Sequence, residues 1–402
     1  MTKGARDRYT FRGNLAASRH GWLRLTPAYS VHLVRELLQQ HARPGYAVLD
    51  PFCGTGTTLL ACAEAGLDCV TVDVNPFLVW LAKTKTSNYD AKSRRDTELL
   101  VAKMIRAAGR PPARRRWIPD MHHIERWWDA RTLDALAAAA HVLSNAPRSR
   151  ASALARVSFC RTLIRCSAAS FGHQSMSFKS ATTAKSASAA RDVCTELALA
   201  HEGVMQAAAS QLPPSRRRAV LGDARQLEGV EREFKIGTLI TSPPYANRMS
   251  YIRELRPYMY WLRYLRDGRE AGELDWKAIG GTWGIATSRL AEWRPAGTTA
   301  PRGLPPLVRS IAEHSDVLAR YVARYFEDMD SHVRSAHARL EPGGTVHYIV
   351  GNSKFYDHVV PVEQLLARQL RSAGFHNARV TQLRKRTSKR ELYEYLVSAR
   401  KP

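Results

Sequence analysis

Short apolar runs of strand length alternate along this chain with longer amphipathic stretches of helix length. Five runs predict buried strands, at 47–49, 69–72, 219–221, 236–240 and 345–350. Because strands that alternate with helices form a parallel sheet, the pattern predicts an α/β fold with a doubly wound, Rossmann-like sheet. Two more runs, near 379–383 and 393–398, predict a terminal antiparallel strand pair.

Helix signals fill the segments between these strands. Thr26 and Pro27 fit the N-cap and the first position of a helix over 29–38. Further helices are predicted over 59–65, 251–265, 311–340 and 361–373, and another begins at Pro76. Residues 267–306 carry glycine, tryptophan and proline with little periodicity, so we predict an irregular segment there.

An all-helical insertion is predicted between the second and third strands. Its amphipathic stretches cover 96–108, 127–143, 152–166 and 191–209. Lysine and arginine outnumber acidic residues across it. Its Ser/Thr/Lys-rich stretch 171–190 is predicted to be a mobile loop that meets phosphates.

Composition narrows the class of protein. The chain has 402 residues, 45% of them hydrophobic, which suffices for a large core and two or three domains. It contains neither an 18-residue apolar run nor an apolar signal-peptide core, so we expect a soluble, cytoplasmic protein with no membrane partner. The six cysteines show no CxxC spacing, so we expect neither a metal site nor a disulfide framework.

The charge balance indicates a polyanionic partner. Lys and Arg number 61 against 36 Asp and Glu, which gives a net charge of +25. Arginine-rich clusters at 114–116, 216–218 and 384–386 lie far apart in the sequence, so a folded surface is the predicted carrier of this charge. The alternative is a ribosome-associated protein, or one that is merely rich in arginine.

A stiff turn follows the fourth predicted strand, with the sequence Thr241-Ser242-Pro243-Pro244-Tyr245. We call it the SPPY turn, after residues 242–245. The two prolines fix the backbone and remove two N–H donors, so the carbonyls of the turn can only accept hydrogen bonds. The Pro243 carbonyl and the Ser242 hydroxyl can accept from an amine while Tyr245 stacks on its ring. This arrangement fits an extruded nucleobase. The alternative is an ordinary proline-rich turn.

Carboxylates are predicted at three strand ends. A turn at Asp50 follows the first strand, and Gly54 and Gly56 let its backbone approach a ligand beside a helix N-terminus. Asp73 ends the second strand, where an acidic side chain can accept from both hydroxyls of a ribose. Asp223 ends the third, where it can accept from the amino group of an adenine. Together they predict a nucleoside pocket, whereas each alone fits a helix cap or loop acid.

On these residues the chain resembles the S-adenosylmethionine-dependent amino-methyltransferases of DNA, the modification methylases. The stretch 50–56 is similar to their cofactor motif, and 241–245 to their catalytic motif. Thr26-Pro27-Ala28-Tyr29 is similar to the segment that covers the methionine end of the cofactor, and Val350-Gly351-Asn352-Ser353 looks like a later family strand. The resemblance covers 20–90, 219–265 and 320–400.

The resemblance implies S-adenosylmethionine as cofactor and S-adenosylhomocysteine as product. The residues it implies for cofactor binding are Thr26, Pro27, Tyr29, Asp50, Pro51, Phe52, Gly54, Gly56, Thr57, Asp73, Val74, Asn75, Asp223, Ala224 and Thr241. Those it implies for catalysis are Ser242, Pro243, Pro244 and Tyr245, with no covalent cysteine and no metal. We expect the methyl sulfonium to face the SPPY turn, since the first and fourth strands flank the switch point of such a sheet.

Within this family the SPPY form is most typical of cytosine-N4 enzymes, whereas DPPY and NPPY favour adenine N6 or RNA guanine N2. The expected function is therefore site-specific methylation of N4 of a flipped cytosine in double-stranded DNA, in restriction-modification or epigenetic marking. A cognate restriction endonuclease and nucleoid association are further expectations. The alternatives are a DNA adenine-N6 enzyme, an RNA guanine-N2 enzyme and a non-catalytic nucleic-acid-binding protein.

The predicted segments are an arm with the cofactor-binding half (1–89), the insertion (90–215), the catalytic-motif region (216–266), a candidate target-recognition segment (267–306) and the rest of the catalytic domain (307–402). Candidate DNA contacts are Arg114, Arg115, Arg116, His173, Gln174, Lys179, Lys185, Arg248, Arg253, Arg269 and Lys277. We expect the insertion to clamp the DNA backbone and 267–306 to read bases. The oligomeric state is left open.

Overall fold

The computed structural model describes residues 9–10, 12–23, 28–110, 116–170, 177–178, 192–246, 252–282, 285–295, 300–386 and 391–402, and the statements below concern these residues. Among them, no helix is long and apolar enough to cross a membrane.

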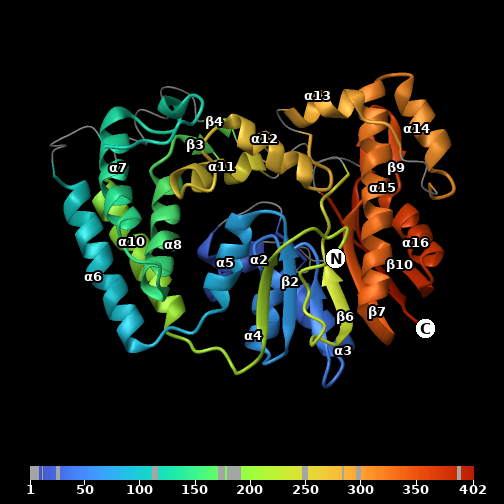
Figure 1. Ribbon diagram of the computed structural model, residues 1–402, viewed down its shortest axis with the longest axis horizontal. Coiled ribbons are helices and arrows are strands. Elements are labelled where there is room, and N and C mark those ends of the chain that lie inside the picture. Colours follow the sequence, from blue (N-terminus) through green and yellow to red (C-terminus); the bar gives the residue numbers. More distant parts are fainter. Residues whose placement is uncertain are drawn as a thin grey trace.

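One mixed sheet of 7 strands, in the order β10-β11-β7-β6-β1-β2-β5, forms the centre of the fold (Figure 1). The strands are β1 (Ala47–Asp50), β2 (Cys69–Asp73), β5 (Arg217–Leu221), β6 (Ile236–Thr241), β7 (Leu340–Gly351), β10 (His376–Lys385) and β11 (Tyr393–Arg400). The pairs from β5 to β7 are parallel, whereas β11 runs antiparallel to both β7 and β10. The predicted doubly wound sheet with a terminal antiparallel pair is confirmed.

The order of the strands reverses between β1 and β6. From β1 the chain proceeds outward to β2 and β5, and it then returns to β6 and continues to β7 on the other side. Leu49 of β1 pairs with Leu239 of β6. The carboxyl ends of these two strands therefore flank the topological switch point, which is where open α/β sheets bind ligands.

Helices cover both faces of the sheet because successive strand residues point to opposite sides. Val48 and Ile240 pack on the face covered by α3 (Val31–His41), α4 (Thr57–Glu64) and α5 (Pro76–Thr86). Leu49 and Leu239 pack on the opposite face, covered by α15 (Asp316–Arg339) and α16 (Val362–Ser372). All four side chains are buried, so the sheet lies between two hydrophobic layers.

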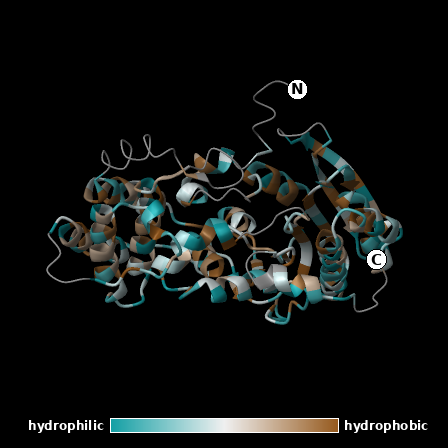
Figure 2. Cartoon of the chain, turned by 90° about the horizontal axis from the view of Figure 1, so that it is seen from above, coloured by the Kyte–Doolittle hydropathy of each residue, from teal (hydrophilic) through white to brown (hydrophobic). Residues whose placement is uncertain are grey.

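The insertion is helical, as predicted, and lies at the end of the molecule opposite the C-terminal strands (Figure 1). It contains α6 (Ala91–Ala108), the 3₁₀ helix η2 (Ile124–Arg126), α7 (Ala130–Ser144), α8 (Arg150–Arg165) and α10 (Val193–Ala208). A short strand pair, β3 (Ala169–Ser170) with β4 (Ser177–Phe178), was not predicted. Hydrophobic and hydrophilic residues both occur along these helices, as expected where one face of each helix is buried (Figure 2).

The insertion shares its core with α11 (Ile252–Trp261), the helix that follows the SPPY turn. The ring of Phe77 in α5 stacks on Tyr258 with 5.4 Å between centroids. Trp128 and Phe159 of the insertion meet Trp261 edge-on at 5.8 and 5.9 Å. The helix α11 is therefore packed between the sheet domain and the insertion.

Several predicted boundaries are wrong. The first long helix begins at Val31, and the Ser30 side chain accepts from the Leu33 N–H as its N-cap, so Thr26 does not cap it. Thr26 and Pro27 themselves lie outside the described residues. The strand β7 begins at Leu340, whereas the predicted strand began at Thr345 after a turn. Within β7, Gly343 adopts φ +71°, and the register with β6 shifts between the pairs made by Leu340 and Thr345.

The segment 267–306 is not irregular. It contains α12 (Gly268–Lys277), α13 (Ile285–Glu292) and the start of α14 (Leu304–Ala312). The side chain of Asp267 caps α12 by accepting from the Glu270 N–H at 2.9 Å. Short helices contain few apolar residues per face, so their periodicity is weak in the sequence. Besides these, α2 (Arg12–Leu15), η1 (Ser18–Trp22), β8 (Ser353–Phe355) and β9 (His358–Val360) were not predicted.

Arg19 of η1 joins the N-terminal arm to the sheet domain and the insertion. The residue is only 2% exposed, and its guanidinium donates to the backbone carbonyls of Lys85, Ser87, Ala207, Ala208 and Ser210. These carbonyls belong to the last turns of α5 and α10 and to the residues just after them. One buried cation therefore satisfies acceptors at two helix C-termini.

We predict that Arg19→Met lowers the free energy of unfolding by roughly 2–4 kcal/mol, because it removes charge-assisted hydrogen bonds and leaves buried carbonyls without a partner. Urea unfolding measures the change. The exposed Arg95 of α6 offers the matched control, and Arg95→Met should stay within about 0.5 kcal/mol of the unmodified protein. Equal stability of the two variants would contradict this role of Arg19.

Candidate active site

The carboxylate of Asp50 joins three segments at the switch point. It is fully buried at the end of β1 and accepts hydrogen bonds from the Tyr29 hydroxyl at 3.0 Å and the Thr241 hydroxyl at 2.5 Å. The Phe52 N–H donates to it at 3.2 Å. Burial raises the pKa of Asp50 to about 7. Asp50, Tyr29 and Thr241 thus bind one another at the switch point, and their predicted contact with the cofactor stays a prediction.

The turn after β1 requires its glycines. Gly54 and Gly56 have φ of +50° and +76°, where residues with a side chain are strained. A Cβ on Gly56 would also lie 3.0 Å from the Cβ of Ala82 in α5. The buried Lys85 stabilises the turn by donating to the Thr55 carbonyl at 3.0 Å. Burial lowers the pKa of Lys85 to about 7. The sequence analysis did not identify Lys85.

Asp73 at the end of β2 lies against this turn. Its carboxylate accepts from the N–H groups of Gly54 and Asn75, each at 2.9 Å. Asn75 caps α5 by accepting from the Phe77 N–H at 3.0 Å, while Val74 between them is half-buried. Burial raises the pKa of Asp73 to about 6, although part of the residue is exposed. The predicted acid and the glycine turn therefore lie together at the sheet edge.

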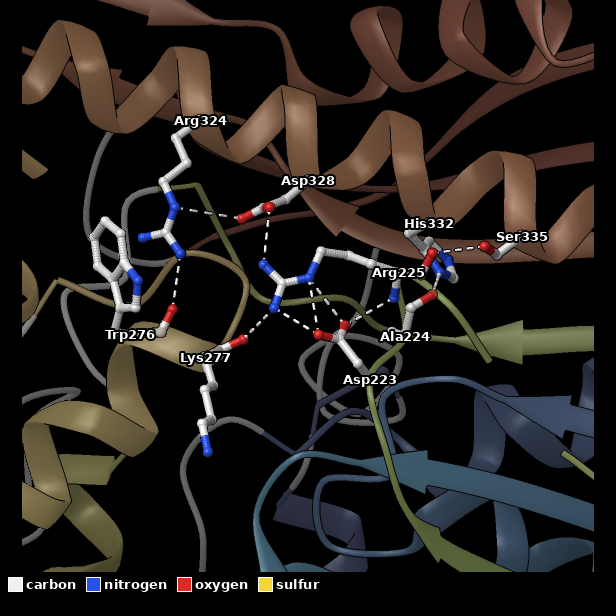
Figure 3. A network of polar contacts seen from close by, with 9 residues as sticks. All are labelled: Asp223, Ala224, Arg225, Trp276, Lys277, Arg324, Asp328, His332 and Ser335. Carbon is white, nitrogen blue, oxygen red and sulfur yellow. Dashed lines mark hydrogen bonds and ion pairs between the residues drawn. The ribbon is translucent and has the colours of Figure 1, made fainter. Parts of the chain in front are cut away.

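Asp223, after β5, is bound by an arginine that the sequence analysis missed. The Nε and Nη2 atoms of Arg225 donate to its carboxylate at 3.0 and 2.6 Å (Figure 3). Arg225 also donates to Asp328 of α15 at 2.9 Å and to the Lys277 carbonyl at 2.8 Å. The sequence does not reveal the role of Arg225, because its other two partners lie 52 and 103 residues further along the chain.

A second arginine, Arg324, binds the C-terminal end of α12, the helix that ends at Lys277. The guanidinium carbon of Arg324 lies 3.5 Å from the centroid of the Trp276 ring, and Arg324 donates to the Trp276 carbonyl at 2.7 Å (Figure 3). The C-terminus of α12 is therefore fixed by two arginines beside Asp223. Cations at a helix C-terminus are favourable, since the carbonyls there lack helical partners.

His332 of α15 joins Phe52 and Ala224, two residues predicted to bind the cofactor. Its Nδ1 lies 2.8 Å from the Ala224 carbonyl, and its ring meets Phe52 edge-on at 4.8 Å. Its Nε2 lies 2.9 Å from the Tyr348 hydroxyl. Burial lowers the pKa of His332 to about 4, so the ring is neutral at pH 7 and Nδ1 donates to the carbonyl. Its only sequence signal is a place on the buried side of a long helix.

The SPPY turn is braced on several sides. The Ser242 hydroxyl donates to the Ile349 carbonyl of β7 at 3.0 Å, and it keeps lone pairs that can accept. From α15, the Tyr325 hydroxyl donates to the Pro244 carbonyl at 2.8 Å, and the Tyr321 hydroxyl to the Tyr245 carbonyl at 3.3 Å. Pro243 is buried. The turn is thus a rigid group of acceptors one strand away from the Asp50 turn.

The predicted DNA contacts are only partly described. Arg253, Arg269 and Lys277 are exposed and Arg116 is half-buried. The other predicted contacts lie outside the described residues: Arg114, Arg115, His173, Gln174, Lys179, Lys185 and Arg248. In the described parts of the chain no group of three metal-ligating side chains occurs, and all six cysteines are free.

The arginine cluster 216–218 is engaged within the molecule. Arg216 pairs with Asp68 at 2.7 Å and Arg218 with Glu231 at 3.2 Å. The cluster begins β5, so it lies at the sheet edge opposite the SPPY turn. Arg384 pairs with Glu394 at 2.6 Å, next to the turn. Two of the three clusters are therefore used in part for internal contacts.

Comparison with known proteins finds similarity over the part of the chain that contains the first motif. Residues 17–84 match the family model of N6/N4 methyltransferases, described as DNA methylase. The chain is 40% identical over 58 residues to the type II methyltransferase M.MjaII of Methanocaldococcus jannaschii, which is 14% of this chain and 11% of that protein. It is 34% identical over 68 residues to the type II methyltransferase M.AvaI of Nostoc sp., 17% of this chain and 14% of that protein.

These matches span about one tenth of the relatives' own length and leave the SPPY turn outside the matched family segment. Among solved structures, the rRNA methyltransferase AviRa from Streptomyces viridochromogenes aligns over 99% of this chain and 95% of its own, at 12% identity. Its TM-score of 0.32 is too low to support an argument.

We predict that ionisation of Asp50 makes stability depend on pH. Its pKa is raised from 3.8 to about 7, so its contribution is fully present below pH 3.8 and is lost as the pH rises through about 7. Relative to Asp50→Asn, the unmodified protein should lose up to about 1.4 kcal/mol of unfolding free energy per pH unit within this window. Urea unfolding of both proteins from pH 5 to 8 measures the difference. A difference that stays constant over this range would contradict the assignment.

Proposed function

We propose that this chain is an S-adenosylmethionine-dependent DNA methyltransferase that acts on the exocyclic N4 of cytosine. The observation that carries the proposal is the position of two turns, 50–56 and 241–245, at the carboxyl ends of the adjacent strands β1 and β6. The family match over residues 17–84 supports the same class. The SPPY form of the second turn favours cytosine over adenine.

The residues at this edge fit the proposed cofactor. When bound, S-adenosylmethionine supplies an electrophilic methyl group. The Gly54 and Gly56 turn allows close approach of backbone, and Asp73 offers a carboxylate that ribose hydroxyls can donate to. Asp223 and Ala224 would lie at the adenine end. Because Arg225 already binds Asp223, an adenine amine would share that carboxylate with it.

The SPPY turn would hold and orient the target amine. The nitrogen of cytosine N4 is a weak nucleophile because its lone pair is delocalised into the ring. Acceptance of its N–H groups by the Ser242 hydroxyl and the Pro243 carbonyl would favour rehybridisation of the nitrogen. Orientation of reacting groups contributes up to roughly 7–11 kcal/mol in favourable cases. Stacking on Tyr245 would offset the few kcal/mol that base extrusion costs.

Double-stranded DNA is the proposed partner. A net charge of +25 favours a polyanion, and the exposed Arg269 and Lys277 lie on α12, whose C-terminus is fixed beside Asp223. We therefore propose that α12 contacts DNA near the extruded base while the insertion binds the backbone. The type II methyltransferase names of the partial relatives support a restriction-modification role, and a cognate endonuclease is a further proposal.

Adenine N6 is the second candidate target, because the matching family model covers both chemistries. Nucleoside analysis of DNA from cells that express the chain separates the two, and we expect N4-methylcytosine. N6-methyladenine in its place would overturn the base assignment but leave the methyltransferase proposal intact. Methylated RNA with unmodified DNA would overturn the substrate class.

We predict that Asp73→Ala weakens binding of S-adenosylhomocysteine by about 10- to 100-fold, because two hydroxyls lose a charged acceptor. Calorimetry measures the affinity. Since burial raises the pKa of Asp73 to about 6, the affinity of the unmodified protein should fall as the pH drops below 6. Asp73→Asn should lose this pH dependence. An affinity that all three proteins share would refute the ribose assignment.

We predict that Tyr245→Ala mainly raises KM for DNA, about tenfold or more, since base stacking is worth roughly 1–3 kcal/mol. Pro243→Ala should mainly lower kcat, because it loosens the acceptor turn. Steady-state methylation of a short duplex measures both constants. Tyr46→Ala serves as control, because Tyr46 precedes β1 at the opposite sheet edge. Unchanged kinetics in both site variants would rule out the SPPY model.

A further inference from the structure

The ring of Tyr245 is held by the C-terminal strand pair. Its hydroxyl donates to Oε1 of Glu394 in β11 at 2.7 Å. The guanidinium carbon of Arg386, which follows β10, lies over the ring at 4.9 Å from its centroid. Glu394 and Arg386 are 5% and 8% exposed, so both contacts are made in a buried environment. Neither residue belongs to the cofactor or the catalytic motif, although Arg386 lies in the arginine-rich cluster 384–386.

Gly351 lets the ring reach Glu394. The strand β7 lies between β6, which precedes Tyr245, and β11, which carries Glu394. Gly351 of β7 pairs directly with Glu394. A Cβ on Gly351 would lie 3.6 Å from the Tyr245 Cζ and 3.1 Å from Nη1 of Arg386. The tyrosine side chain therefore crosses the end of β7 where no side chain intervenes.

The acceptor on Glu394 is itself rigid. Arg384 donates to its other carboxylate oxygen at 2.6 Å, across the β10–β11 pair. Arg386 donates to the Asn352 carbonyl at 3.3 Å, and Asn352 accepts from the Tyr393 N–H at 2.8 Å. A hydrogen bond to a charged acceptor is stronger than one between neutral groups. The orientation of the ring is thus set by fixed groups on both strands of the pair.

We propose that Glu394 is a positioning residue for Tyr245, and that the terminal strand pair thereby belongs to the base-capture site. This proposal rests on the proposed function. A ring that is oriented before the base arrives does not lose side-chain freedom when it stacks, so less binding free energy is spent on ordering. The hydroxyl donates to Glu394, so Tyr245 meets a planar base through its ring and not through its O–H.

A double-mutant cycle of Tyr245→Phe and Glu394→Ala tests the proposal. Both substitutions cut the same hydrogen bond and leave an aromatic ring in place. We expect each to raise KM for DNA about tenfold, with kcat and S-adenosylhomocysteine affinity within about twofold of the unmodified protein. The double variant should be no worse than the more affected single variant. Glu394→Gln, which keeps an acceptor oxygen, should restore part of the loss.

The matched control is Glu391→Ala. Glu391 lies three residues before Glu394 and pairs with Lys354 at 3.0 Å on the surface, so its loss should leave KM unchanged. Calorimetry with S-adenosylhomocysteine shows whether each variant is folded, and Glu394→Leu, which also removes the acceptor, replaces Glu394→Ala in the cycle if the latter is not.

Three results would overturn the proposal. The first is that the effects of the two substitutions on KM multiply in the double variant. The second is that neither substitution raises KM although the unmodified protein methylates DNA. In both cases Glu394 does not position Tyr245, and the proposed function stands. If the unmodified protein binds the cofactor but methylates no DNA, the proposed function fails and the positioning role fails with it.

Discussion

A single buried carboxylate connects the parts of the site. Asp50 accepts from Tyr29, from Thr241 and from the backbone of Phe52 at the point where the strand order reverses. A polar group without partners would be costly there, so the three donors and the acid hold each other in place. Since Thr241 opens the SPPY turn, the position of that turn relative to the glycine turn depends on this contact. The remainder of the site extends outward from it.

The far side of the SPPY turn depends on distant parts of the chain. Two tyrosines of α15 donate to its carbonyls, and Ile349 of β7 accepts from its serine. Tyr245 then extends across β7 to Glu394. The resulting turn has few ways to move, which suits a site that must present acceptors to an amine in one geometry. Rigidity of this kind favours orientation-dependent chemistry.

Hydrophobic packing and ionic hydrogen bonds join the helices α11 and α12, which follow the SPPY turn, to the sheet domain. The helix α11 shares a core with α5 and the insertion. The next helix, α12, ends on the carbonyls that Arg225 and Arg324 bind, and Arg225 also binds Asp223. A displacement of α12 would therefore act on Asp223, the acid proposed to bind the adenine of the cofactor. Arg225 therefore connects α12, in the segment after the SPPY turn, to Asp223 at the end of β5.

The sequence by itself determined the strands, the two turns and the insertion helices, because apolar runs, glycines and prolines act over a few residues. It did not reveal α12 and α13, whose short faces contain little periodicity, or Ser30 as the cap of α3. Only the tertiary structure decided that Arg225 binds Asp328 and that Tyr245 binds Glu394, partners that lie 103 and 149 residues away. It also decided that Arg216 and Arg218 bind internal acids, since charge in a sequence does not specify its neighbour. Such pairings depend on which strands lie side by side, and strand order is a property of the whole fold.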